Sequence, residues 1–392
     1  MIYLDHAATT AVAPQALEEM LPYFCGQYGN PSTMYSLGTG SKKAVNEAKR
    51  RLAGMLGAEM EEIYFTSGGT ESDNWAIRGV AEGYAHKGRH IITTRIEHHG
   101  VLHPCEYLEK QGYRVTYLPV DSGGMISTED LEAAICPDTI LISVMFANNE
   151  VGTIQPIKEI GALAREKGIL FHTDAVQAFG HLDINVQELG IDLLSASGHK
   201  INGPKGIGFL YVNKTVKLPA LLRGGAQERG LRAGTENVPG IVGMAVAAGL
   251  WQDNRKKRQE HEKELQEYLF RRLTEEIPHC SVNGDRCRRL PGNVHVSFPG
   301  IEGESLLIML DMKGICASSG SACTTGARKP SHVLLAMGLT EQEARGSLRL
   351  TLSWENTREE LDEAVEAIKE IVGRLRTMSP DYSCYMKSLE KG

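Results

Sequence analysis

The sequence predicts an α/β fold in which a mostly parallel sheet is flanked by helices, followed by a smaller α+β domain. From about residue 60 to 212, short β-rich runs alternate with helical segments, as in a parallel sheet with crossover helices. A long helical pattern then spans about residues 238–277, and beyond it the order of strands and helices changes. A length of 392 residues exceeds one typical core and favours two domains.

Seven β-rich runs account for the larger sheet, and helical patterns separate most of them. The runs are residues 63–66, 90–94, 113–118, 139–146, 169–173, 192–196 and 207–212. The helical patterns are residues 71–86, 101–111, 127–134 and 157–167, the last ended by Gly168 as a C-terminal stop signal. Ligands bind at the carboxyl ends of the strands in such sheets, so functional side chains are expected there.

The C-terminal third has the pattern of a smaller α+β domain. Strands are expected near residues 293–298 and 347–352, and helices near residues 304–313, 331–337 and 357–376. The mixed charges at residues 253–264 indicate a solvated helix face that joins the two domains. The segment from about residue 379 is expected to be a mobile tail.

Composition and charge exclude several classes of function. The chain is 42% hydrophobic and 23% charged, the balance of a soluble globular protein rather than a disordered one. A net charge of -7 with interspersed signs argues against direct nucleic-acid binding. No apolar run approaches the ~20 residues of a membrane helix, and the N-terminus lacks a signal-peptide pattern, so a cytoplasmic protein is expected.

The eight cysteines do not resemble a disulfide framework, because they are scattered and include no CxxC pair. Reduced thiols are therefore expected. Cys323 stands out because it lies in a loop rich in Gly, Ser and Thr, residues 316–326 (CASSGSACTTG), with no hydrophobic reason for its position. A flexible loop suits a nucleophile that must reach a substrate and then present its cargo elsewhere. An ordinary loop thiol is the other interpretation.

A candidate Schiff-base lysine, Lys200, lies between two predicted strands in residues 195–206 (SASGHKINGPKG). Taken alone, an exposed loop lysine is the favoured interpretation, and the other segments must overturn it. Asp174 ends an apolar strand, where a buried carboxylate needs a partner such as a protonated pyridine nitrogen. Asp174 could instead cap the next helix.

Residues 66–72 (TSGGTES) pass from a strand into a helix, where free backbone N–H groups and the helix dipole form an anion site. The stretch lacks the GxGxxG and P-loop patterns, so a phosphate cup of another kind is predicted. A plain capping turn, with Thr70 or Ser67 as the cap, remains open.

Histidines and one arginine complete the candidate set. His98 and His99 precede His103 by five and four residues, but further metal ligands are not evident, and an imidazole stacked on a cofactor ring explains one histidine. Arg349 lies within an apolar strand, so its charge needs a carboxylate partner. That partner is either an amino-acid substrate, held by a bidentate pair, or an internal salt bridge.

Taken together, these motifs resemble the NifS/IscS-type cysteine desulfurases, which are fold-type I pyridoxal-phosphate enzymes of aminotransferase class V. The resemblance spans almost the whole chain. Its motifs are residues 3–10 (YLDHAATT), 29–32 (GNPS), 66–71 (TSGGTE), 97–98 (EH), 148–152 (NNEVG), 174–177 (DAVQ), 197–200 (SGHK), 232–237 (RAGTEN) and 319–323 (SGSAC).

The resemblance implies a role for each matching residue. Lys200 would form the Schiff base with pyridoxal 5'-phosphate, Asp174 would pair with the pyridine nitrogen, Gln177 would bond the ring oxygen, and His98 would stack on the ring. The expected phosphate ligands are Gly69, Thr70, Ser197 and His199, with Thr235 from the other subunit of a homodimer. Asn149 and Arg349 would orient the substrate L-cysteine, Asn149 also bordering the cofactor.

The implied reaction takes sulfur from L-cysteine, releases L-alanine and leaves a persulfide on Cys323. Lys200 would move the Cα proton, and Cys323 would attack the substrate sulfur as a thiolate. The sulfur would pass to an iron–sulfur scaffold or another acceptor protein, for iron–sulfur cluster assembly or tRNA thiolation. No intrinsic metal is implied, although Cys323 could ligate an iron–sulfur cluster shared with a scaffold.

The resemblance also implies a division into domains. Residues 15–255 would form a large domain that binds pyridoxal phosphate. Residues 1–14 and 256–378 would form the small α+β domain that carries the Cys323 loop, and residues 379–392 would form a flexible tail. Tyr35 stands where many relatives have histidine, and the tail around Cys384 matches no familiar pattern.

Three other functions remain open at this stage. A selenocysteine lyase would release little sulfide from cysteine, and a class V aminotransferase would not need Cys323. A catalytically silent scaffold protein would keep the fold but lose Lys200 or Cys323, both of which this chain has.

Overall fold

The computed structural model describes residues 1–319 and 330–389, so Cys323 lies outside the described residues. A seven-stranded sheet forms the centre of the larger part, with the strand order β2-β8-β7-β6-β5-β3-β4. Its strands are β2 (Ile63–Thr66), β3 (His90–Thr94), β4 (Arg114–Leu118), β5 (Thr139–Ser143), β6 (Leu170–Asp174), β7 (Leu193–Ser197) and β8 (Gly208–Val212). β8 runs antiparallel to both neighbours and the other pairings are parallel, which confirms the mostly parallel α/β sheet.

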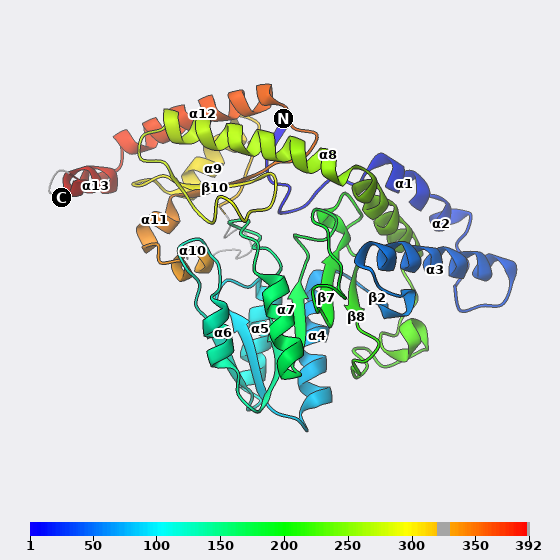
Figure 1. Ribbon diagram of the computed structural model, residues 1–392. Helices are drawn as coiled ribbons and strands as arrows, with labels where there is room; N and C mark the ends of the chain where they lie inside the picture. Colours follow the sequence, from blue (N-terminus) through cyan, green and yellow to red (C-terminus); the bar gives the residue numbers. More distant parts are fainter. Residues whose placement is uncertain (320–329, 390–392) are drawn as a thin grey trace.

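Helices flank this sheet on both faces (Figure 1). They are α3 (Ser36–Leu56), α4 (Gly69–Tyr84), α5 (His99–Glu109), α6 (Thr128–Ala134) and α7 (Ile157–Lys167), with α1 (Pro14–Met20) and α2 (Pro22–Cys25) at the N-terminal side. One hydrophobic core packs α3 and α7 against one face of the sheet, and another packs α4 and α5 against the opposite face. The sheet is therefore the middle of three layers.

Local signals explain where individual helices begin and end. α7 ends at Gly168, which adopts the left-handed conformation (φ 67°) and donates its N–H back to the last turn. The side chain of Ser127 accepts a hydrogen bond from Asp130 N and so caps α6. A capping box between Thr357 and Glu360 starts α12 (Arg358–Thr377).

The smaller part is built on a three-stranded antiparallel sheet of the order β12-β10-β9. The remaining elements are β1 (Ile2–Tyr3), β9 (Ser281–Val282), β10 (Asn293–Ser297), β11 (Ile315–Cys316), β12 (Ser347–Thr351), α9 (Gly303–Met312), α10 (His332–Ala336), α11 (Glu341–Arg345) and α13 (Pro380–Leu389). β1 pairs with β11, so the N-terminus of the chain joins this part. Residues 380–389, expected to belong to a flexible tail, form the helix α13.

The long helix α8 (Val238–Glu276) connects the two parts and lies beside α12 at its far end (Figure 1). Its buried residues up to Trp251 belong to the core of the large sheet, and those from Leu265 to Leu273 belong to the core of the small sheet. We propose on this basis that the domain boundary falls between Trp251 and Leu265, as in the predicted division at residue 255.

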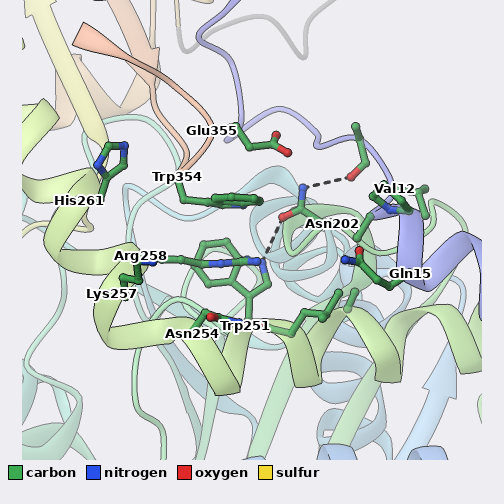
Figure 2. A pocket seen from close by; sticks show the side chains of 15 residues that line it. Val12, Gln15, Asn202, Trp251, Asn254, Lys257, Arg258, His261, Trp354 and Glu355 are labelled. Carbon is green, nitrogen blue, oxygen red and sulfur yellow. Dashed lines mark hydrogen bonds between the residues drawn. The ribbon is translucent and has the colours of Figure 1, made fainter.

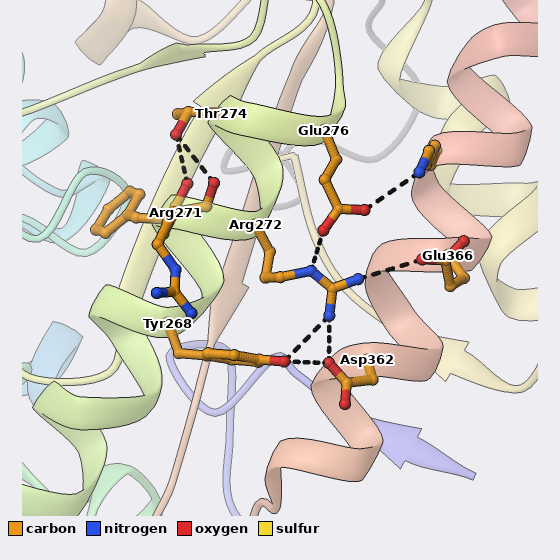
Figure 3. Close-up of polar contacts among 9 residues, drawn as sticks. Tyr268, Arg271, Arg272, Thr274, Glu276, Asp362 and Glu366 are labelled. Atoms are coloured by element: carbon orange, nitrogen blue, oxygen red, sulfur yellow. Dashed lines mark hydrogen bonds and ion pairs between the residues drawn. The ribbon is translucent and has the colours of Figure 1, made fainter.

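Arg272 connects the end of α8 to α12 (Figure 3). Its guanidinium binds Glu276 on its own helix and Asp362 and Glu366 on α12, and it also donates to Tyr268 Oη over 3.1 Å. The Arg272 side chain is only 19% exposed, whereas Asp362 and Glu366 are 48% and 62% exposed, so the ion pairs to α12 are surface ion pairs of small individual strength. This cluster ties the two long helices of the small domain together.

Candidate active site

The candidate site lies where the parallel strands of the large sheet end. β2, β3, β5, β6 and β7 lead at their carboxyl ends to most of the predicted site residues. Those residues are Gly69 and Thr70, His98, Asn149, Asp174 with Gln177, and Ser197 with His199 and Lys200. Strand polarity therefore brings together residues that are more than 100 positions apart, as expected for this class of sheet.

A cavity of about 420 Å³ opens at the N-terminus of α4, and Gly69, Thr70, Ser197 and His199 are among its lining residues. α4 starts at Gly69 without any side-chain cap, because its N-cap residue is Gly68, and the hydroxyl of the preceding Ser67 donates to Glu71. The first N–H groups of a helix have no partner within the helix, and its dipole favours an anion there. The capping-turn interpretation of residues 66–72 is thus wrong, and the geometry suits a phosphate.

Asp174 is buried (6% exposed) at the end of β6. Its Oδ1 accepts a hydrogen bond from Val176 N over 2.9 Å, and the chain continues there as a turn, so Asp174 caps no helix. Burial raises the pKa of Asp174, and the nearby His98 and Lys200 partly offset that rise. Such a carboxylate is ready to pair with a cation that enters the site.

His98 precedes α5 and accepts a hydrogen bond from Gly100 N at its Nδ1 over 3.0 Å. Because a backbone N–H can only donate, Nδ1 carries the lone pair and the neutral ring carries its proton on Nε2. Burial lowers the pKa of His98, which keeps the ring neutral. A neutral, oriented imidazole is suited to stacking on a flat ligand.

The N-terminal segment covers Lys200. Lys200 Nζ donates to the carbonyl oxygens of Ala7 (2.5 Å) and Ala8 (2.7 Å), and Gln177 Nε2 also donates to Ala7 O over 3.0 Å. His199 Nδ1 lies 3.1 Å from Thr9 Oγ1, and burial lowers the pKa of His199 to about 4. Sequence patterns gave no sign that these backbone carbonyls would hold the lysine.

Arg349 lies on β12 of the small domain and is 4% exposed. Its Nη2 lies 2.8 Å from Asp5 Oδ1 and its Nη1 donates to Asn149 O over 2.9 Å. The internal salt bridge that the sequence left open is therefore present. Burial raises the pKa of Asp5, and Arg349 opposes that rise, which shows that this ion pair is partly shielded from solvent.

Two predicted site residues do not join this group in one chain. Thr235 is exposed and does not line the 420 Å³ cavity of its own chain. Cys323 falls outside the described residues.

Among residues not predicted, Asp73 on α4 lies next to Asp174 and His98, and Thr9 and Lys205 line the cavity. Asp73 follows Gly69 by one helical turn. Residues at this spacing share one face of a helix, and this was the signal in the sequence that could have identified Asp73 as a site residue.

A larger cavity of about 770 Å³ lies between α8 and the N-terminal segment and contains none of the predicted site residues (Figure 2). Arg258 is stacked between Trp251 (4.5 Å) and Trp354 (4.8 Å) on its wall. Asn202 donates to Ala11 O over 3.1 Å and accepts from Trp251 Nε1 over 3.2 Å. These contacts support the N-terminal segment that covers Lys200.

Comparisons with known proteins agree with this geometry. The aminotransferase class-V family model matches residues 2–364. Cysteine desulfurase IscS of Clostridium botulinum (strain Hall) is 54% identical over 392 residues, which cover 100% of this chain and 99% of that protein. Cysteine desulfurase IscS of Methanosarcina thermophila is 55% identical over 379 residues, covering 97% of this chain and 94% of that protein.

Solved structures show the same relationship. A NifS-like protein superposes with a TM-score of 0.90 at 39% identity, over 95% of this chain and 100% of that chain. SspA in complex with cysteine superposes with a TM-score of 0.82 at 40% identity, over 91% of this chain and 100% of that chain. No helix among the described residues has the length and apolarity to cross a lipid bilayer. The chain therefore belongs to the aminotransferase class-V family, and within it to the cysteine desulfurases of the NifS/IscS type.

Proposed function

We propose that this protein is a pyridoxal-phosphate-dependent cysteine desulfurase, which converts L-cysteine to L-alanine and holds the sulfur as a persulfide on Cys323. The observation that carries the proposal is the single cluster of an uncapped helix N-terminus, a buried carboxyl and a lysine amine at one sheet edge. The relatives named cysteine desulfurase, at 54–55% identity over nearly the whole chain, support it. SspA, whose structure is described as a complex with cysteine, supports the choice of substrate.

The residues of the site fit pyridoxal 5'-phosphate. Its phosphate would be held at the N-terminus of α4 by Gly69 and Thr70, with Ser197 and His199, which also line the cavity. A Cβ at Gly69 would lie 2.5 Å from Val176 Cγ2, so a larger residue would displace Val176 or the first turn of α4.

The ring would be held by three further side chains. The buried Asp174 would pair with the pyridine nitrogen, Gln177 would bond the ring oxygen, and the neutral imidazole of His98 would stack on the ring. Lys200 would hold the cofactor covalently through Nζ. When bound, pyridoxal phosphate supplies an electron sink for the electron pair left when a substrate Cα–H bond is broken.

The substrate carboxylate would bind Arg349, with Asn149 beside it. Arg349 is held by Asp5 Oδ1 and Asn149 O, and its Nε is buried without a hydrogen-bond partner. A carboxylate that approaches this guanidinium competes with Asp5, whose raised pKa lowers the cost of releasing it in neutral form. This exchange would couple substrate binding to the N-terminal segment.

Lys200 and Cys323 would carry out the two chemical steps. Lys200 Nζ, once displaced by the substrate amine, would take the Cα proton and later return it to the product. Cys323 Sγ, as thiolate, would form a bond to the substrate sulfur while the Cβ–S bond breaks. The electron pair of that bond stays with the three-carbon unit, which takes up protons and leaves as alanine, and Cys323 keeps the sulfur as a persulfide.

Two partners follow from this function. A homodimer is proposed, because Thr235 is exposed and lies outside the cavity of its own chain, so it is free to reach the phosphate of the partner subunit. The persulfide would pass to an iron–sulfur scaffold or another acceptor protein, for cluster assembly or tRNA thiolation. The relatives named IscS support this class of acceptor.

The proposal is tested by alanine and sulfide formation from L-cysteine with a reductant, together with the visible absorbance of the bound cofactor. Wild type should be yellow and active. Lys200→Ala should lose the colour and lose activity by about 10³-fold or more, whereas Cys323→Ser should stay yellow and be inactive. A fully active Cys323→Ser variant would exclude the persulfide mechanism and favour a lyase or an aminotransferase.

A further inference from the structure

A carboxylic acid, Asp73, is buried behind the candidate site and has no part in the mechanism above. It lies on α4, one turn after Gly69, and is 1% exposed. Its Oδ1 has no hydrogen-bond partner, and His172 Nε2 lies 3.7 Å away. A buried carboxylate is costly unless a cation or several donors compensate it, so the charge state of Asp73 needs an explanation.

The groups that face Asp73 offer it little positive charge. Carboxylate or ring-nitrogen atoms of Asp73, Asp174 and His98 lie within 4.8 Å of one another. Glu97, just before α5, is also fully buried and adds a further acidic group nearby. The positive charge of Lys200 lowers the pKa of Asp174 and the pKa of His98.

The histidine on β6 does not supply a cation either. The two ring nitrogens of His172 are hydrogen-bonded to Ser143 Oγ (2.9 Å) and Ser195 Oγ (3.0 Å). Burial lowers the pKa of His172 to about 3, so its ring is neutral at physiological pH. Asp73 and Asp174 are therefore two carboxyl groups within 4.8 Å in a dry environment, and such a pair does not carry two negative charges.

The proton of this pair belongs on Asp73. Asp174 accepts the N–H of Val176 and has the positive charge of Lys200 near it, and both favour its ionised form. Asp73 Oδ1 accepts nothing, and burial together with the charge of Asp174 raises the pKa of Asp73 well above its usual range, although a hydrogen bond from Ser195 opposes that rise. Binding of a pyridinium cation at Asp174 would strengthen this division.

We infer that Asp73 is a positioning residue, a neutral carboxylic acid that leaves the negative charge of the pair on Asp174 where it faces the pyridine nitrogen. The inference rests on the proposed function, since it concerns the cofactor that Asp174 would hold. Asp73 would act through Asp174, because it does not line the cavity at the N-terminus of α4.

Three purified variants test the inference: Asp73→Asn, which is neutral and of the same shape, Asp73→Leu, which has no polar atom, and Asp174→Asn as the matched control. The measurements are the dissociation constant of pyridoxal 5'-phosphate and the pH midpoint of the visible absorbance change. Asp73→Asn should bind the cofactor within about threefold of wild type and keep the midpoint, because an amide replaces an uncharged acid. Asp73→Leu should weaken binding about tenfold, and Asp174→Asn about a hundredfold or more.

Each contrary result has a distinct meaning. If Asp73→Asn weakened binding as much as Asp174→Asn and lowered the pH midpoint by about one unit, Asp73 would be an anion and the inference would be wrong. If Asp73→Leu bound like wild type, Asp73 would have no positioning role. The far-ultraviolet circular dichroism of each variant reports on folding, and the Asn variant decides the case if Leu fails to fold. A colourless wild type would overturn the proposed function as well.

Discussion

At the level of single residues, the missing side chain of Gly69 is as important to the proposed phosphate site at the N-terminus of α4 as any charged group. Gly69 begins α4 and lies against Val176, a β-branched residue that cannot easily turn away. Its small size lets the first N–H groups of the helix face the cavity. Any Cβ at this position competes with Val176 for space.

Gly69→Ala is therefore expected to weaken the binding of pyridoxal 5'-phosphate by about tenfold, since overpacking of this kind costs about 1–3 kcal/mol. A titration of the apoenzyme with cofactor, followed by absorbance, measures the change. The matched control is Gly373→Ala on α12, where a Cβ meets nothing within 4 Å. That control should leave cofactor binding unchanged and stabilise the protein by about 1 kcal/mol. Equal cofactor affinities in the two variants would contradict the steric account.

At the scale of elements, α8 combines two different environments along one helix. Its N-terminal half packs on the large sheet and its C-terminal half on the small sheet, while residues 253–260 between them are mostly exposed. Glu262 is an exception, because it is 1% exposed and its Oε1 has no hydrogen-bond partner. Burial raises the pKa of Glu262 from 4.5 to about 8, although Arg258 opposes that rise.

The raised pKa of Glu262 predicts a loss of stability at alkaline pH. The folded state keeps this proton where the unfolded chain releases it, so the contribution of Glu262 to the free energy of unfolding falls between about pH 4.5 and 8. Glu262→Gln removes this titration. From pH 5 to pH 9, Glu262→Gln should gain about 4 kcal/mol in unfolding free energy relative to wild type.

Urea unfolding at pH 5, 7 and 9 measures the effect. Glu260→Gln, an exposed neighbour on the same helix, is the matched control and should follow the wild-type curve within about 0.5 kcal/mol. Parallel pH curves for Glu262→Gln and wild type would show that Glu262 is ionised in the folded protein across this range.

At the level of the assembly, we propose that the active site is divided between two chains. Lys200 and the N-terminus of α4 belong to one subunit, and the exposed Thr235 would reach the phosphate from the other. Arg232 near it is anchored to Glu71 over 2.8 Å, so the segment that carries Thr235 is attached beside the proposed phosphate site of its own chain. An assembly of this kind makes a specific prediction for mixed dimers.

Lys200→Ala and Thr235→Ala homodimers should both be defective, and subunit exchange between them should restore activity. Each mixed dimer would contain one site with wild-type Lys200 and wild-type Thr235 from opposite chains. Statistical exchange produces about half mixed dimers, and so about a quarter of the sites would be intact. The measurement is desulfurase activity before and after exchange. Activity that does not rise after confirmed exchange would place Thr235 in the site of its own chain.

Much of the fold was predictable because its signals are local. The predicted runs at residues 63–66 and 90–94 coincide with β2 and β3, and the pattern at 157–167 coincides with α7, which ends at the glycine stop. α3 was not predicted, because Gly38, Gly40 and several polar residues weaken its pattern. It is held in place by packing against α8 in the core of the large sheet.

The class of sheet, the strand ends that bear Asp174, Lys200 and the proposed phosphate site, and the family could all be predicted from the sequence alone. These features depend on alternation, strand polarity and motif order, which are all readable along the chain.

Only the tertiary structure decided what surrounds those groups. The carbonyls of Ala7 and Ala8 hold Lys200 across more than 190 residues, and Asp5 pairs with Arg349 across 344. Asp73 meets Asp174 only because α4 packs on the sheet beside β6. Contacts between distant segments have no local signature, and the charge state of a buried acid depends on every group that folding brings near it.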